Sequence, residues 1–131
     1  MNIHQQRVNT LVTLSFPEED KKTQKRITKQ LCKCHKLVMN KIKYHLDEAI
    51  NNNLVSIGIS TYDLDEIVRE NSEPHMWTWM IQHTRDYVEI VMKRFGYEVE
   101  IDKDMLLIKW EKEKHNVGFS ESKQDCKESE Q

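Results

Sequence analysis

The residues of this chain with the clearest capacity for chemistry are lysines that repeat along one segment. Residues 21–43 contain nine Lys and Arg residues and no acidic residue. Most of these lysines recur at steps of three or four, which places them on one face of a helix. Such a face can neutralise nucleic-acid phosphates or contact an acidic protein surface. The candidate binding residues on it are Lys22, Lys25, Lys29, Lys33, Lys36 and Lys43.

Two features favour a protein-contacting or merely solvated lysine face over a nucleic-acid site. Arg26 is the single Arg of the segment, although Arg is the residue best suited to bidentate phosphate contacts. We also expect no exposed aromatic side chain between the lysines to stack on bases. The whole chain has a net charge of −2, so the part outside this segment is strongly acidic. The sequence therefore predicts a protein partner and a homo-oligomer, dimeric or higher, with nucleic acid as the alternative.

Cysteine and histidine stand close together at Cys32, Cys34 and His35, which offers soft metal ligands. A structural zinc site usually needs a second pair of ligands, and only the distant Cys126 remains. We therefore interpret Cys34 as a core residue and Cys32 as partly exposed, and we expect no metal and no cofactor. His83 and Asp86 can meet one helical turn apart, which we interpret as support of the helix.

Catalytic motifs are missing from the sequence: it has no phosphate-binding glycine loop, no nucleophile elbow and no zinc-protease motif. The carboxylates of Asp63, Asp65 and Glu66 come at a predicted helix start, where capping explains them. We therefore expect no catalytic residues and no enzymatic activity.

Two further residues are candidates for an interaction surface. Trp77 and Trp79 point to different sides of a predicted helix. Trp77 falls on the apolar centre of that helix, whereas Trp79 lies at its edge, where a tryptophan can anchor a protein interface or can be a second core residue. Arg85 lies on the polar side of the same helix. We include Trp79 and Arg85 with the lysines as interaction residues.

Apolar periodicity gives the elements that must position these residues. It predicts two long helices, at about 18–52 and 73–95, a short helix at about 64–71 capped by Asp63, and strands at 54–60, 97–101 and 105–110. Alternation from Val8 to Phe16 favours a strand, with a frayed helix as the alternative. The fold class is α+β: the helices pack on a small, mostly antiparallel sheet with a C-terminal hairpin. Residues 1–110 form one domain, and residues 111–131 form a polar tail that we expect to be disordered.

The order helix, strand, helix, helix, hairpin resembles the winged-helix family over about 90 residues. The resemblance implies that the helix at 73–95 is a recognition helix. That helix is nearly all apolar, and its polar side includes Asp86 and Glu89. The predicted hairpin turn, Asp102-Lys103-Asp104, is acidic. The resemblance therefore lies in the order of elements alone.

From these features we predict a non-catalytic protein-interaction module. Its composition, rich in Lys, Glu, Ile and Asn, is common in AT-rich genomes, and small proteins of phages and mobile elements often regulate or inhibit a host protein. The alternative is a winged-helix-like DNA-binding regulator that uses the lysine-rich helix. No run of the sequence approaches a membrane span, and three cysteines suit a reduced compartment, so we expect the cytoplasm, that of the host for a viral protein. The apolar stripe of the first long helix exceeds what a small sheet covers, which predicts self-association through this helix or the Trp79 edge.

Overall fold

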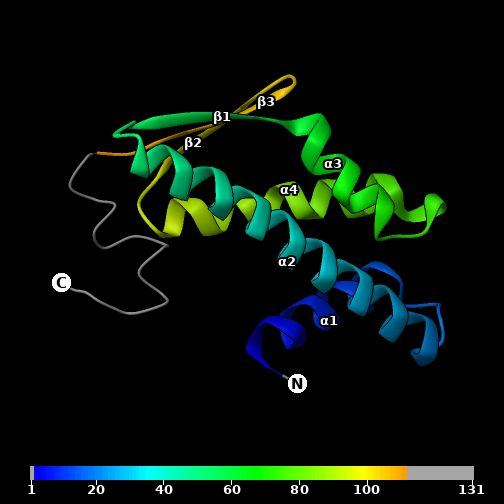
Figure 1. Cartoon of the computed structure of the whole chain (residues 1–131). Coiled ribbons are helices and arrows are strands. Elements are labelled where there is room, and N and C mark those ends of the chain that lie inside the picture. Colours follow the sequence, from blue (N-terminus) through cyan, green and yellow to red (C-terminus); the bar gives the residue numbers. More distant parts are fainter. Residues whose placement is uncertain (1, 112–131) are drawn as a thin grey trace.

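A computed structural model describes residues 2–111 and confirms the α+β class (Figure 1). Two long helices, α2 and α4, cross in the middle of the molecule. The sheet lies on one side of this pair and α1 lies on the other. The elements are α1 (Ile3–Ser15), α2 (Lys21–Asn51), β1 (Ser56–Ser60), α3 (Thr61–Glu70), a 3-10 turn η1 (Pro74–Met76), α4 (Trp77–Arg94), β2 (Glu98–Asp102) and β3 (Met105–Lys109).

Helix α2 organises the core, as its apolar periodicity predicts. Its N-terminus is fixed by Asp20, whose side chain accepts a hydrogen bond of 2.7 Å from the backbone N–H of Thr23. The helix therefore begins three residues later than predicted. Leu31 and Ile42 on its inner face are completely buried. Asn53, with φ of 61°, takes the left-handed conformation just after the helix and turns the chain towards β1.

Of the strand and the helix that the sequence left open for residues 1–16, the helix is confirmed, because residues 3–15 form α1. Asn2 accepts from the backbone N–H of Gln5, and the Gln5 side chain accepts from the backbone N–H of Asn2. This reciprocal capping box starts the helix. Val8 and Val12, one helical turn apart, are buried within the core. Helical spacing prevails over the local alternation, because α2 supplies a surface on which Val8 and Val12 pack.

The sheet is antiparallel with the strand order β1-β3-β2, so the C-terminal hairpin joins the strand that follows α2. Ile108 pairs with Ile57 on one side and Val99 on the other, which puts all three on the face towards the helices. The alternation predicted for these strands is confirmed. The short helix α3 begins directly after β1 rather than at Leu64, so Asp63 lies in its first turn and is not its cap.

The predicted disordered tail lies outside the described residues, apart from Glu111. Within residues 2–111, no helix is both long enough and apolar enough to cross a bilayer.

Candidate interaction surfaces

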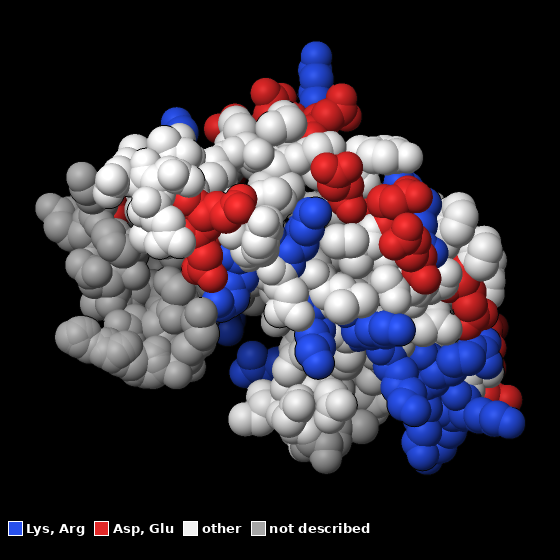
Figure 2. Space-filling view, in the orientation of Figure 1, with Lys and Arg blue, Asp and Glu red and all other residues white. Residues whose placement is uncertain are grey.

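The lysine face of α2, which we define as Lys22, Lys25, Lys29, Lys33 and Lys36, is exposed. These residues follow one line along the helix for about 21 Å, at 1.5 Å per residue. None of the five forms an ion pair with a residue that the structure describes. Figure 2 shows the basic side chains gathered over the N-terminal half of α2, apart from the acidic groups around the hairpin tip at the top.

Two basic residues near this face are already engaged. Arg26 lies 2.7 Å from a carboxylate oxygen of Glu73, which also accepts a 2.6 Å hydrogen bond from Gln30. This contact fastens α2 to the loop before α4. The sixth predicted lysine, Lys43, is half-buried and lies 3.0 Å from Asp47, one helical turn further on. Lys43 therefore serves α2 itself and is not part of the lysine face.

The exposed aromatic side chain of α2, that of Tyr44, follows the lysines of the segment and does not lie between them. It is 58% exposed and lies eight residues beyond Lys36. Its hydroxyl donates a 2.9 Å hydrogen bond to Glu48, and this contact raises the pKa of the tyrosine. The carboxylate of Glu48 would repel a phosphate at this point, so Tyr44 is poorly placed to stack on a nucleic-acid base.

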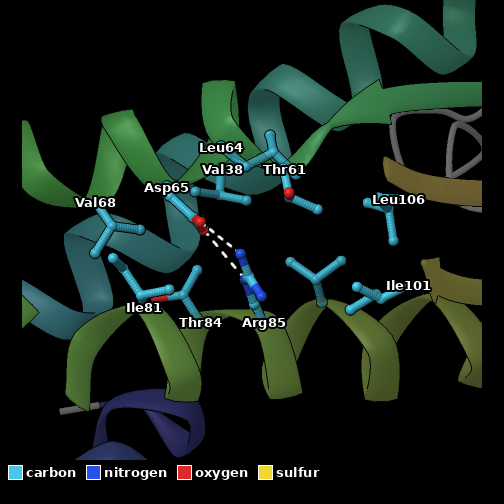
Figure 3. A pocket seen from close by; sticks show the side chains of 11 residues that line it. Val38, Thr61, Leu64, Asp65, Val68, Ile81, Thr84, Arg85, Ile101 and Leu106 are labelled. Carbon is cyan, nitrogen blue, oxygen red and sulfur yellow. Dashed lines mark hydrogen bonds and ion pairs between the residues drawn. The ribbon is translucent and has the colours of Figure 1, made fainter. Parts of the chain in front are cut away.

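Arg85, predicted as an interaction residue, points inward (Figure 3). Its guanidinium donates to both carboxylate oxygens of Asp65 on α3, at 3.2 and 2.5 Å. The Asp65 side chain is only 13% exposed. The pair borders a cavity of about 20 Å³ between α3 and α4, which is too small for an organic ligand. Arg85 therefore joins two helices and is not free for a partner.

Polar and charged side chains on the outer side of α4 pair with one another. Lys93 lies 2.7 Å from Glu89, and the Gln82 amide donates to Asp86 at 3.0 Å. Among the described residues on this side of α4, Arg94 is the one basic residue that points outward and forms no ion pair. Asp102 and Asp104 flank the hairpin tip. These are the two places where a winged-helix protein would contact DNA, and neither is basic.

Trp79 is half-buried at the edge of α4. Phe16, at the end of α1, meets its ring edge-on at 5.0 Å, and His83 lies 4.4 Å from it on the other side. Trp79 therefore links α1 to α4, and the rings of Phe16 and His83 cover much of its indole. His83 faces Trp79 rather than Asp86, so the predicted contact between His83 and Asp86 is not formed.

A cluster of three rings joins α1, α2 and α4. His35 of α2 is buried and stacks on Tyr87 of α4, with ring centres 4.0 Å apart and planes nearly parallel. Its Nδ1 atom lies 3.2 Å from Nε2 of His4 on α1. Burial, together with the nearby His4 and His83, lowers the pKa of His35 to about 3. His35 is therefore neutral in the folded protein at ordinary pH.

Beside this ring cluster lies a groove of about 390 Å³ between α1 and α4. Its floor is apolar, and Ile90 within it is 57% exposed. Arg7 and Arg94 line it, and neither forms an ion pair with any residue between 2 and 111. Sequence reasoning missed this groove, because it exists only when residues 3–15 form a helix.

The cysteine and histidine cluster of α2 does not converge on one point. Cys34 is buried in the core and burial raises its pKa to about 11, whereas Cys32 is half-buried on another side of the helix. Between residues 2 and 111, no group of three or more His, Cys, Asp or Glu side chains is placed to hold a metal ion.

The apolar stripe of α2, predicted to meet a second copy, is covered within the chain. Helix α1 packs along its N-terminal half, and its buried side chains belong to a single core with those of α4 and the sheet. That reason for self-association therefore no longer applies, and oligomerisation itself stays a prediction.

Comparison with family models, with curated proteins and with solved structures found no match to this chain in any of the three.

Proposed function

We propose that this chain is a non-catalytic protein-interaction module that binds an acidic surface of a partner protein through the lysine face. The observation that carries the proposal is the contrast within α2. Arg26 and Lys43 have acidic partners in the chain, whereas the five lysines of the face are exposed without any among the described residues. In this proposal the module acts by occupancy, as a regulator or inhibitor of the protein that it binds.

A protein partner fits the chemistry of the face better than nucleic acid does. The face consists of lysines alone, and its single arginine neighbour is committed to Glu73. Lysine is a compact point charge that suits scattered carboxylates, whereas planar bidentate recognition of phosphates favours arginine. The one exposed aromatic residue of α2, Tyr44, lies beyond the face and is hydrogen-bonded to Glu48, so it does not offer a stacking platform for bases among the lysines.

Capture experiments with matched variants test this proposal. The triple variant Lys25→Glu, Lys29→Glu and Lys33→Glu removes the face. The triple variant Lys41→Glu, Lys103→Glu and Lys109→Glu changes net charge equally at exposed lysines elsewhere. We expect the wild-type chain and the second variant to capture the same protein from a lysate of the source cells after nuclease treatment, and the first variant to lose it. Capture that disappears with nuclease, or persists in the first variant, contradicts the proposal.

The acidic surface that the lysine face binds can belong to another copy of this chain, and the protein is then a homo-oligomer. Glu98, Glu100 and Asp102 are exposed on β2, and Asp104 follows in the turn. Association of this kind weakens as salt rises, because the charges are exposed and screened. Sedimentation at micromolar concentration in low and high salt measures it, and a monomer under both conditions contradicts it.

A winged-helix DNA-binding regulator is the second candidate. The order of the elements and the pairing of the hairpin with β1 favour it. Binding through the lysine face should then weaken steeply with salt, by roughly one power of the salt concentration for each phosphate contacted. Gel-shift titration of a random 20-base-pair duplex between low and physiological salt decides between the candidates, since tight binding at physiological salt would favour this one.

A further inference from the structure

We propose that the groove between α1 and α4 is a second binding site, separate from the lysine face, that takes an amphipathic helix of a partner protein carrying apolar anchors flanked by carboxylates. The groove is open and its floor is apolar. Two arginines line it, and its walls are two helices held at a fixed spacing.

The shape and floor of the groove suit apolar side chains. Its volume of about 390 Å³ lies in the range of sites that bind a ligand or a few side chains. Leu11 and Val91 line it, and Ile90 projects into it with more than half of its surface exposed. A large apolar side chain exposed inside a concavity is typical of a site that excludes water when a partner binds.

The charges that line the groove select the partner. Arg7 on α1 and Arg94 on α4 stand on opposite walls, and both lack an ion pair among residues 2–111. Their fields reach the ring cluster: Arg7 contributes to the lowered pKa of His4, after the larger effect of burial. Asp86 also lines the groove and accepts a hydrogen bond from the neutral amide of Gln82, so the lining has two arginines against one acidic residue. Carboxylates on the partner therefore complement the two walls.

Contacts between aromatic rings fix the spacing between the two walls of the groove. His4, His35 and Tyr87 are in mutual contact, with the ring centres of His4 and Tyr87 4.9 Å apart, and Phe16 abuts Trp79 at the far end of α1. These contacts hold α1 beside α4 while leaving Ile90 uncovered. Two helices with an open apolar seam between them accept a third helix in the helix-in-groove manner, with anchors at intervals of three and four residues.

A designed peptide tests the site directly. The probe is a stapled 16-residue helix with Leu at steps of three and four and Glu at the other positions. Two control peptides replace every Glu by Lys or every Leu by Ser. We expect the acidic probe to shift the NMR signals of Arg7, Tyr87, Ile90 and Arg94 in the full chain. We expect both controls to bind at least about ten-fold more weakly, since few residues carry most of an interface.

Protein variants separate this site from the lysine face. Ile90→Asp and Arg94→Glu should each weaken the acidic probe by about ten-fold, while Leu14→Asp, at an exposed position of α1 outside the groove, should leave it unchanged. The triple lysine-face variant should also keep the interaction, so failure of the proposed function leaves this test intact. Unchanged melting of each variant shows that the fold is kept.

Four outcomes overturn the proposal. The first three are equal binding of the Ser control peptide, shifts confined to α2 together with loss in the lysine-face variant, and no shift at millimolar probe. The fourth is self-association that Ile90→Asp abolishes, because the occupant is then a second copy of this chain.

Discussion

The two long helices of this protein, α2 and α4, differ in how their charged residues are arranged and paired. Along α2, lysines follow one another at steps of three and four, and the helix itself has no acidic residue before Asp47. Along α4, Glu89 and Lys93 pair one turn apart, and Arg85 reaches Asp65 on α3. The comparison shows that the spacing and sign of neighbouring charges decide which of them remain available to a partner.

The same comparison separates architecture from recognition. The charged residues of α4 mostly serve the fold, because they satisfy one another or join helices. Those of the lysine face contribute nothing to packing, since they point away from the core. This contrast is the physical reason for proposing that the lysine face serves binding.

The largest expected effect contrasts the two sides of α2. Leu31 is completely buried, so Leu31→Ala should lower the free energy of unfolding by roughly 2–5 kcal/mol. Lys33→Ala, two positions on and exposed, should change it by less than about 0.5 kcal/mol. Urea denaturation followed by circular dichroism measures both. Equal losses would show that the lysine face packs against something in the folded protein.

The second effect concerns the ring cluster and is a dependence on pH. Because the folded pKa of His35 is about 3 and its unfolded pKa is near 6.5, the unfolded chain binds more protons between these values. Stability should therefore fall as pH is lowered from about 6.5 towards 3, with a limiting slope of about 1.4 kcal/mol per pH unit.

His4 adds to this dependence in the same direction, since its pKa is also lowered. Denaturation of the wild type and His35→Leu at several pH values isolates the His35 contribution. The variant should show a shallower slope between pH 6.5 and 4.5, and parallel curves would mean that His35 is not buried as described.

A third effect compares two ion pairs. Asp65→Ala leaves the partly buried Arg85 without its carboxylate and should cost about 1–3 kcal/mol. Glu89→Ala breaks an exposed pair of α4 and should cost less than about 1 kcal/mol. Thermal unfolding of both variants at the same ionic strength measures the difference. If Glu89→Ala were the more damaging, the division between inward and outward charges of α4 would be wrong.

The smallest effect is a gain in stability. Lys29→Glu places a carboxylate one turn from both Lys25 and Lys33, so it should stabilise α2 by about 0.2–0.5 kcal/mol for each new pair. The same change should weaken binding of the acidic partner. Melting temperature and capture should thus move in opposite directions, whereas a merely solvated face would show the first change without the second.

The sequence by itself determined the elements that repeat a strong local pattern. The apolar stripe of α2 and the alternation of β1 and β2 are set by side-chain periodicity, which needs no knowledge of the partner element. The lysine face was visible for the same reason. Lys43 and Arg85 are both paired within the chain. The pair of Lys43 with Asp47, one helical turn away, follows from the sequence spacing, whereas the pair of Arg85 with Asp65 depends on how α3 and α4 pack.

Only the tertiary structure decided whether residues 3–15 form a helix or a strand, and therefore whether the groove between α1 and α4 exists. Alternation and helical spacing were both present between Val8 and Phe16, and packing against α2 selected the helix. The Asn2 and Gln5 capping box was the one local signal that could have corrected the prediction. The groove brings Arg7 next to Arg94, far away in the chain, and a single sequence does not specify such a juxtaposition, because it arises from how helices pack.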